Sequence, residues 1–316
     1  MGTADRRSPA APNQTTRRGG AAIGCSLVLA CSACTEGETQ PVDGPWVDVV
    51  VGDDFACALA EDGKVTCWGS VEPPPDEPLV QLSAQFGHAC GITRDDAIVC
   101  WIGSDEFEDV GQADPPAGGY RQVSAGYRHG CALTADGEVL CWGPDPEEDG
   151  YGGDGRVNDA PEGVFDRVAA GYAQSCALAL GGPIECWGEG SAVEDRDGSF
   201  RQVEAGWAMT CSLDESGAVS CWGSGDDDEE SGSWNWDPEG TFTDVACNDD
   251  ECAIALDGSI LCHFWGQPSE WEPPSGAFTA IAIGHGACAI DTAGGIVCWG
   301  GTPEGDGTPG PVEERF

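Results

Sequence analysis

The segment CALTADGEVLC at 131–141 alternates apolar and polar positions on either side of a central Asp-Gly. If it folds about residues 135–137, Cys131 faces Cys141 and Leu133 faces Val139. Successive strand residues point to opposite faces, so both cysteines and the Leu/Val pair lie on one face. A three-residue loop with glycine in the left-handed conformation is a common hairpin connection. The pattern therefore predicts an antiparallel β-hairpin.

Seven copies of this hairpin occur, each with two cysteines ten positions apart. Directly opposed residues in an antiparallel pair have Cα atoms about 4.5–5.5 Å apart, which a disulfide accepts. Zinc sites favour two cysteine pairs at closer spacing, so we predict disulfides and no metal site. The predicted pairs are Cys57 and Cys67, Cys90 and Cys100, Cys131 and Cys141, Cys176 and Cys186, Cys211 and Cys221, Cys252 and Cys262, and Cys288 and Cys298.

An aromatic or apolar residue and a Val-x-Ala-Gly-like segment precede each hairpin. Repeats of about 39 residues therefore start near 46, 79, 120, 165, 200, 242 and 278. Such a unit of three or four short strands cannot bury both faces alone, and packing around an axis gives a β-propeller. We predict an all-β, seven-bladed β-propeller over residues 46–316, in which the tryptophan after each second cysteine fills the space between blades.

The string V-x-A-G-x-x-H-x-CAL-x-x-DG-x-V-x-CWG, clearest at 123–143, resembles the regulator of chromosome condensation repeat, especially its cysteine-paired form in exported bacterial proteins. The resemblance covers residue 46 to about residue 300 and implies a seven-bladed propeller. After CWG the family often has Gly-Gln-Leu-Gly, which only residues 110–112 approach, so the outer strands are expected to be short or missing. The founder's nucleotide-exchange activity on chromatin is not carried over, because the basic surface is absent and a fold does not carry its function.

The N-terminus has the features of an export signal. Four arginines precede the apolar stretch 21–30, and residues 28–31 resemble a bacterial lipobox. We predict a lipoprotein-type signal peptide over 1–30, lipidation of Cys31, and a flexible tether over 31–45, with Cys34 as a second candidate. The product is placed at the outer membrane or cell surface, or in the periplasm or medium if the lipobox is not used.

Charge narrows the choice of partner. The chain has 13 Lys+Arg against 56 Asp+Glu, a formal charge of −43. Such a surface repels nucleic acid and anionic lipid, so we expect no nucleic-acid binding and membrane association only through the N-terminal lipid. The single lysine, Lys64, precedes Val65, so no phosphate loop ending in Gly-Lys-Ser/Thr exists.

No catalytic motif is found, and we predict neither an enzyme nor a bound cofactor. His88, His129 and His285 lie two or three residues before a first hairpin cysteine. We expect them to pack or cap the hairpin entry. The abundant carboxylates leave one alternative open, an extracellular carbohydrate-active enzyme with acids at the propeller mouth.

The loops contain the remaining candidates. Residues 145–155, 225–230 and 248–251 are rich in oxygen ligands, which leaves weak calcium binding and calcium-dependent adhesion as a second alternative. Trp234 and Trp236 lie among acids and are the predicted binding residues. We predict an exported, non-catalytic binding scaffold for a protein or polysaccharide. Cys247, at the place of the repeat glycine, has no assigned role.

Overall fold

The computed structural model describes residues 45–103, 109–144, 159–189, 192–224, 233–264, 272–300 and 314–315. The chain divides into two compact units, Met1–Glu38 and Thr39–Phe316, and every described residue belongs to the second. The described residues form strands, turns and loops, and among them there is no helix that is long and apolar enough to cross a membrane.

Seven antiparallel sheets follow one another along the chain, and in each the strands pair in chain order. We call the sheets blades 1 to 7, counting from the N-terminus. The strands are β1 (Trp46–Val51), β2 (Phe55–Ala60), β3 (Val65–Gly69), β4 (Leu79–Gln85), β5 (His88–Thr93), β6 (Ile98–Ile102), β7 (Tyr120–Ala125), β8 (Gly130–Thr134), β9 (Val139–Trp142), β10 (Phe165–Ala170), β11 (Gln174–Ala179), β12 (Ile184–Gly188), β13 (Phe200–Ala205), β14 (Met209–Asp214), β15 (Val219–Ser224), β16 (Ser233–Trp236), β17 (Phe242–Cys247), β18 (Glu251–Ala255), β19 (Ile260–His263), β20 (Phe278–Ile283), β21 (Gly286–Asp291), β22 (Ile296–Gly300) and β23 (Glu314–Arg315).

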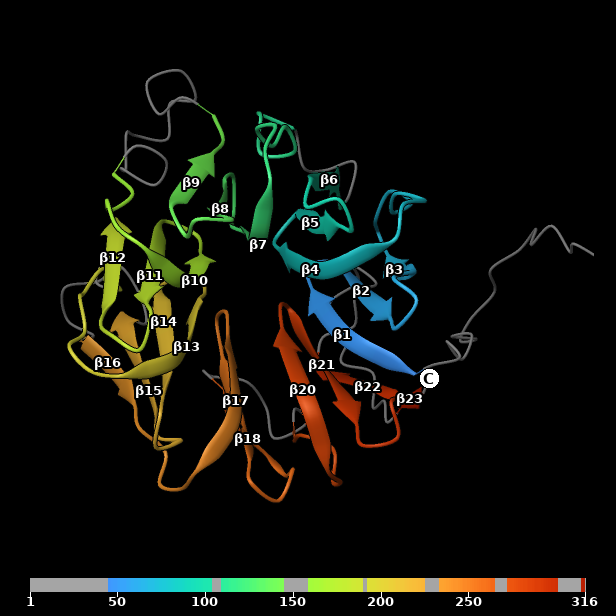
Figure 1. Ribbon diagram of the computed structural model, residues 1–316. Helices are drawn as coiled ribbons and strands as arrows, with labels where there is room; N and C mark the ends of the chain where they lie inside the picture. Colours follow the sequence, from blue (N-terminus) through green and yellow to red (C-terminus); the bar gives the residue numbers. More distant parts are fainter. Residues whose placement is uncertain are drawn as a thin grey trace, which may run out of the picture. The chain divides into compact units, whose positions relative to one another are not determined.

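The first strands of successive blades lie against one another, from β1 through β4, β7, β10, β13 and β17 to β20. β20 also contacts β1, so the second unit closes into a ring of seven blades with these inner strands around its axis (Figure 1). The all-β, seven-bladed propeller is confirmed.

The predicted hairpin is confirmed in its register. Cys131 pairs with Cys141 and Leu133 with Val139, and Gly137 at the turn has a φ of +86°. The two cysteines form a disulfide with a Cα–Cα distance of 4.0 Å. All seven blades contain the equivalent disulfide.

The cores lie between neighbouring blades. Trp101 of blade 2 packs with Phe55 and Leu59 of blade 1, and Trp142 of blade 3 packs with Ile92 of blade 2. These tryptophans therefore fill the space between neighbouring blades and bury a face that a single sheet leaves open. This is the role expected of them.

The departure from the Gly-Gln-Leu-Gly pattern predicted short or missing outer strands. Within the described residues a fourth strand occurs only in blade 5, as β16, and in blade 7, as β23. β23 pairs with β22 through Glu314 and Arg315. The C-terminal end of the chain thus contributes to the last blade.

Every inner strand has a β-bulge after its first residue. In β1 the bulge lets Trp46 and Val49 both face the core, although they are three positions apart. The polar residue between them, Asp48, then faces the ring axis. Bulges re-aim side chains in this way, and here they supply the polar lining of a central channel.

Candidate functional site

One end of the ring is built from the seven turns that join the first and second strands of each blade, and we call it the axial mouth. Backbone bonds link neighbouring turns: Tyr127 N donates to Gly171 O at 3.0 Å and Tyr172 N to Gly206 O at 3.0 Å. The same kind of bond runs from Trp207 N to Asn248 O at 3.1 Å. The residues at the tips of these turns are Asp53, Phe86, Tyr127, Tyr172, Trp207, Asp249 and His285.

Four consecutive turns present aromatic rings that form one cluster, the aromatic sector. Tyr172 and Trp207 stack with centroids 4.0 Å apart, and Tyr127 lies 4.5 Å from Tyr172. Phe86 meets Tyr127 edge-on at 5.1 Å. Trp207 remains 42% exposed. Aromatic rings held at these distances attract one another beyond simple burial, so the sector is a pre-formed surface.

Phe86 and the preceding Gln85 cross the axis. The Phe86 ring from blade 2 lies 5.5 Å from Trp207 of blade 5. Gln85 Nε2 donates to Ala205 O at 3.0 Å, a bond between residues 120 positions apart. Phe86 is buried, with a φ of +50°, in the left-handed region that disfavours side chains. Blade 2 thus plugs the channel beneath the aromatic sector.

The other three turns form a charged sector. His285 Nε2 lies 3.7 Å from Asp53 Oδ1. Burial raises the pKa of Asp53 to about 6, an effect that His285 opposes and that Asp54 and Asp249 strengthen. Partial burial also raises the pKa of Asp249, which keeps an exposed side, and His285 again opposes this rise. The axial mouth is therefore aromatic over one arc and acidic over the other.

Behind the mouth, the central channel has a volume of about 350 Å³ and is lined by all seven inner strands. Its polar residues tie blades together: Gln81 bonds both the N–H and the carbonyl of Val123 at 2.9 Å, and Gln122 bonds Val168 in the same way. The lining residues that bond the backbone of the next blade are Asp48, Gln81, Ser83, Gln122, Ser124, Gln202 and Asp244.

Three carboxyl groups in this channel have raised pKa values. Burial raises the pKa of Glu204 to about 7, against the hydrogen bond that it accepts from Gln202 Nε2 at 3.2 Å. Burial raises the pKa of Asp48 to about 6 and also raises the pKa of Asp244. Asp48 and Asp244 accept backbone N–H bonds across blades, so their position has a structural explanation. Glu204 lacks such a bond in the described part of the channel.

Comparison with known proteins agrees with this architecture. The family model of the regulator of chromosome condensation (RCC1) repeat matches residues 46–70 and 120–147. No curated protein sequence matches the chain. The chain therefore carries RCC1 repeats. The family expected from the repeated string is confirmed, whereas its exported bacterial form stays a prediction.

Solved structures show the same fold. The CRINKLY WD40 ectodomain of the Arabidopsis thaliana receptor kinase ACR4 aligns with a TM-score of 0.63 and 24% identity over 80% of this chain and 93% of that chain. Prp20p from Saccharomyces cerevisiae aligns with a TM-score of 0.56 and 14% identity over 77% and 78%. The structure of Kap60 bound to yeast RCC1 (Prp20) aligns at 0.61 and 12% over 93% and 91%.

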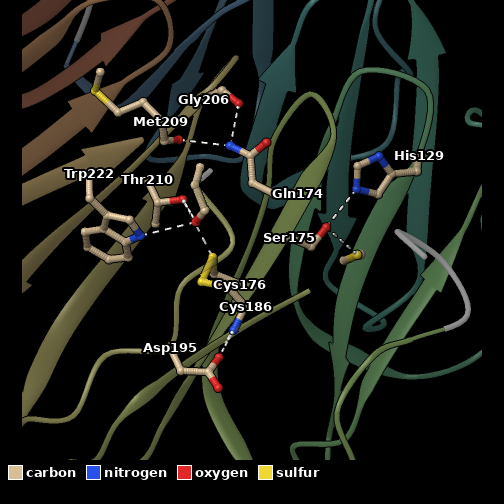
Figure 2. Close-up of a disulfide and its surroundings, with 12 residues drawn as sticks. His129, Gln174, Ser175, Cys176, Cys186, Asp195, Gly206, Met209, Thr210 and Trp222 are labelled. Atoms are coloured by element: carbon tan, nitrogen blue, oxygen red, sulfur yellow. Dashed lines mark hydrogen bonds between the residues drawn. A yellow bond between two sulfur atoms is a disulfide. The ribbon is translucent and has the colours of Figure 1, made fainter. Parts of the chain in front are cut away.

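The histidines of the RCC1 repeats separate into two kinds. His129 is buried and its Nε2 lies 2.8 Å from Ser175 Oγ of blade 4, which also lies 3.7 Å from Cys131 Sγ (Figure 2). Gln174, at the same repeat position, bonds Gly206 O and Met209 O of blade 5 at 3.0 Å (Figure 2). This position therefore links one RCC1 repeat to the next.

His88 occupies the same position, but Gly130 stands where blade 4 has Ser175. Neither ring nitrogen of His88 has a hydrogen-bond partner among the described residues, and burial lowers the pKa of His88 to about 4. His88 and His129 pack as expected. The expectation was wrong for His285, which is 54% exposed in its side chain at the axial mouth.

The predicted binding tryptophans lie elsewhere, in β16 at the outer edge of blade 5. Trp236 is partly buried and packs against the core between blades 5 and 6, which gives its ring a structural part. For Trp234 only the backbone is described, paired with Gly223. A binding role for either stays a prediction, as does lipidation of Cys31, which lies outside the described residues.

Cys247 is buried and, among the cysteines of the described ranges, the one without a disulfide. It aligns with Ala205, since Val245 and Val203 pair equivalently, so Asn248 and not Cys247 stands at the repeat glycine. Within the described chain no three His, Cys, Asp or Glu residues gather to hold a metal ion, residues 248–251 included. The acidic loops 145–155 and 225–230 lie outside the described residues.

One pattern in the sequence marks the axial mouth, and it was not used to choose Trp234 and Trp236 as binding residues. The residue four positions before the first hairpin cysteine is aromatic in four consecutive repeats: Phe86, Tyr127, Tyr172 and Trp207. This position varies among the seven repeats, whereas the cysteines around it are constant. Such a variable position indicates where the blades of a propeller differ in what they expose.

Proposed function

We propose that the chain is an exported, non-catalytic binding scaffold whose axial mouth contacts a protein or polysaccharide partner. The observation that carries this proposal is the aromatic sector, where four rings from four blades gather at one end of the ring and Trp207 is 42% exposed. Exposed, pre-positioned aromatic side chains are enriched at binding hot spots. Sites of this kind lie on loops held by a rigid scaffold.

Export is the second part of the proposal. Seven hairpin disulfides suit a protein that folds in an oxidising compartment. Neighbours of the fold include receptor-kinase ectodomains. With the apolar stretch at 21–30 and its lipobox, these observations support lipidation at Cys31 and a place at the outer membrane or cell surface.

Binding to another protein has support from the relatives. The structures of yeast Prp20 are described by its complex with Kap60 and by its binding to Gsp1p and histones. These partners belong to Prp20. They support the use of such a propeller as a protein-binding surface.

The acids of the channel favour binding over catalysis. A glycosidase needs two free carboxyl groups beside the scissile bond, one as general acid and the other as base or nucleophile. Asp48 and Asp244 hold the backbone of the next blade, and Phe86 and Gln85 cross the axis at the mouth. These residues hold neighbouring and opposite blades together, whereas the exposed residues of the axial mouth support a role in binding.

The test is capture of a partner by the mature ring, residues 31–316, against two variants. Trp207→Ala removes the exposed ring of the aromatic sector. Leu180→Ala removes a 77% exposed apolar side chain from a hairpin turn, which lies at the other end of blade 4. We expect Trp207→Ala to lose an envelope partner that wild type and Leu180→Ala retain. Equal capture by all three would contradict the proposed site.

A further inference from the structure

The axial mouth combines two chemistries that select for one kind of group. Its aromatic sector offers ring faces, and carboxylates flank this sector on both sides. Trp207 N bonds Asn248 O at 3.1 Å, which puts Asp249 beside the last ring. Asp53 N bonds Phe86 O at 2.9 Å, which puts a second carboxylate beside the first. Rings between carboxylates are the surroundings that a cation prefers.

The two carboxylates beside the aromatic sector are not saturated with hydrogen bonds within the described part of the chain. Asp53 Oδ1 is buried, yet no hydrogen bond from the described residues reaches it, and His285 stays 3.7 Å away. Asp249 is exposed. An ionised carboxylate is an acceptor for several N–H donors, so Asp249 at the surface can take a donor from outside, and Asp53 adds negative charge at the other flank of the sector. A guanidinium group supplies such donors while its flat face lies on a ring.

The chain itself places arginine on aromatic rings twice, once away from the mouth and once within the aromatic sector. Arg196 lies over Trp222 at 4.5 Å, and Arg128 lies over Tyr127 at 5.4 Å, at the rim of the mouth. Trp207, the most exposed ring of the sector, has no such internal cation among the described residues. This propeller can therefore hold a guanidinium group over an aromatic ring, and the face of Trp207 has no such group from the described residues.

Net charge points the same way. A chain of formal charge −43 attracts cationic ligands and repels anionic ones over the whole molecule. A neutral sugar would also lie on Trp207 but would gain little from Asp53 and Asp249. We infer that the axial mouth binds a cationic side chain, arginine foremost, presented by a basic segment of a protein partner. This inference rests on the proposed function and names the chemistry of its partner.

The experiment uses the mature ring and calorimetric titration with short peptides. The probe is acetyl-Gly-Arg-Gly-Arg-Gly-amide, and its matched control replaces both arginines by citrulline, which keeps the shape and removes the charge. Neutral oligosaccharides are titrated separately. The variants are Trp207→Ala and Asp249→Asn, with Asp136→Asn as a charge-matched control in a hairpin turn at the opposite end of blade 3.

We expect the arginine peptide to bind at least about tenfold more tightly than the citrulline peptide, and Trp207→Ala and Asp249→Asn each to weaken it by about tenfold. Asp136→Asn should leave the affinity within about twofold, because an exposed charge at the far end is screened. Raising the salt concentration should weaken binding to wild type.

Three outcomes would overturn the inference. Equal binding of the two peptides, no effect of Asp249→Asn, or binding of an oligosaccharide alone would each show that the mouth does not select charge. If Trp207→Ala still abolished capture of the envelope partner, the proposed function would stand without this inference. If Trp207→Ala changed neither peptide binding nor capture, both would be wrong.

Discussion

Glu204 gives the most direct test of the channel electrostatics. Burial among Asp244, Asp48 and the protein wall raises its pKa from 4.5 to about 7. A carboxyl group whose pKa is raised on folding stabilises the fold below its unfolded pKa, and this contribution is lost as pH rises through the folded pKa. Glu204→Gln removes the titration while keeping the size of the side chain and a hydrogen-bonding end. The gap in stability between variant and wild type should therefore depend on pH.

The size of the effect follows from the two pKa values. A pKa difference of one between the folded and unfolded chain corresponds to about 1.4 kcal/mol, so a rise from 4.5 to about 7 amounts to about 3 kcal/mol in full. Between pH 5 and pH 8 about 2–3 kcal/mol of this is expressed, because the unfolded chain is already partly ionised at pH 5. Relative to wild type, Glu204→Gln should gain that much unfolding free energy on going from pH 5 to pH 8.

Urea denaturation with the disulfides intact, followed by tryptophan fluorescence at both pH values, measures this gap. Glu138→Gln, at an exposed turn position, is the matched control and should shift stability equally at pH 5 and pH 8. A gap for Glu204→Gln that is the same at both pH values would refute the reasoning. It would mean that water in the channel solvates Glu204 in its ionised form.

Three further predictions concern the fold. His88→Met places in blade 2 the residue that blade 5 has at this position, Met209. The unfolding free energy of this variant should rise by about 2 kcal/mol relative to wild type on going from pH 7 to pH 5, because the pKa of His88 is about 4 in the folded chain and 6.5 in the unfolded chain. A difference in urea denaturation that is the same at both pH values would contradict this. Phe86→Gly should lose about 2–3 kcal/mol of unfolding free energy, since the lost ring outweighs the relief of a positive φ, and Phe86→Leu should lose less. The reverse order of the two would show that backbone strain dominates. Replacing both Cys131 and Cys141 by alanine should cost about 2–3 kcal/mol in the same assay, as closure of a short loop predicts. An unchanged urea midpoint would show that this disulfide does not constrain the unfolded chain.

Much of the fold could be predicted because the residue patterns that specify it lie within single repeats. Cys131 and Cys141 are ten residues apart, and the alternation between them specifies their pairing in the hairpin. The repeated tryptophan signals an open face on each sheet, and the structure places Trp101 and Trp142 against the preceding blade. Because this hairpin pattern occurs seven times, a ring of seven similar sheets was the architecture that the sequence predicted.

Other assignments failed where the repeat pattern is interrupted. Cys247 belongs at the alanine position, since residues 248–250 separate it from its partner Glu251, one residue fewer than between the equivalent pair Ala205 and Thr210, which shifts the alignment by one residue. His285 lies within the equally short turn of blade 7 and is exposed, whereas His88 and His129, at similar distances from their cysteines, are buried. A binding role for Trp236 stays a prediction, and only the tertiary structure shows that its ring packs against the core between blades 5 and 6.

The sequence by itself determined the hairpins, their disulfides, the number of blades and the acidity of the molecule, because each follows from spacing within about forty residues or from composition. Only the tertiary structure decided that Gln85 and Phe86 reach blade 5, that four rings form one sector, and that Asp53 and Asp249 flank it. These contacts join residues up to 120 positions apart. Closure of the ring brings such residues together, and no pattern along the chain encodes which of its variable positions will then face one another.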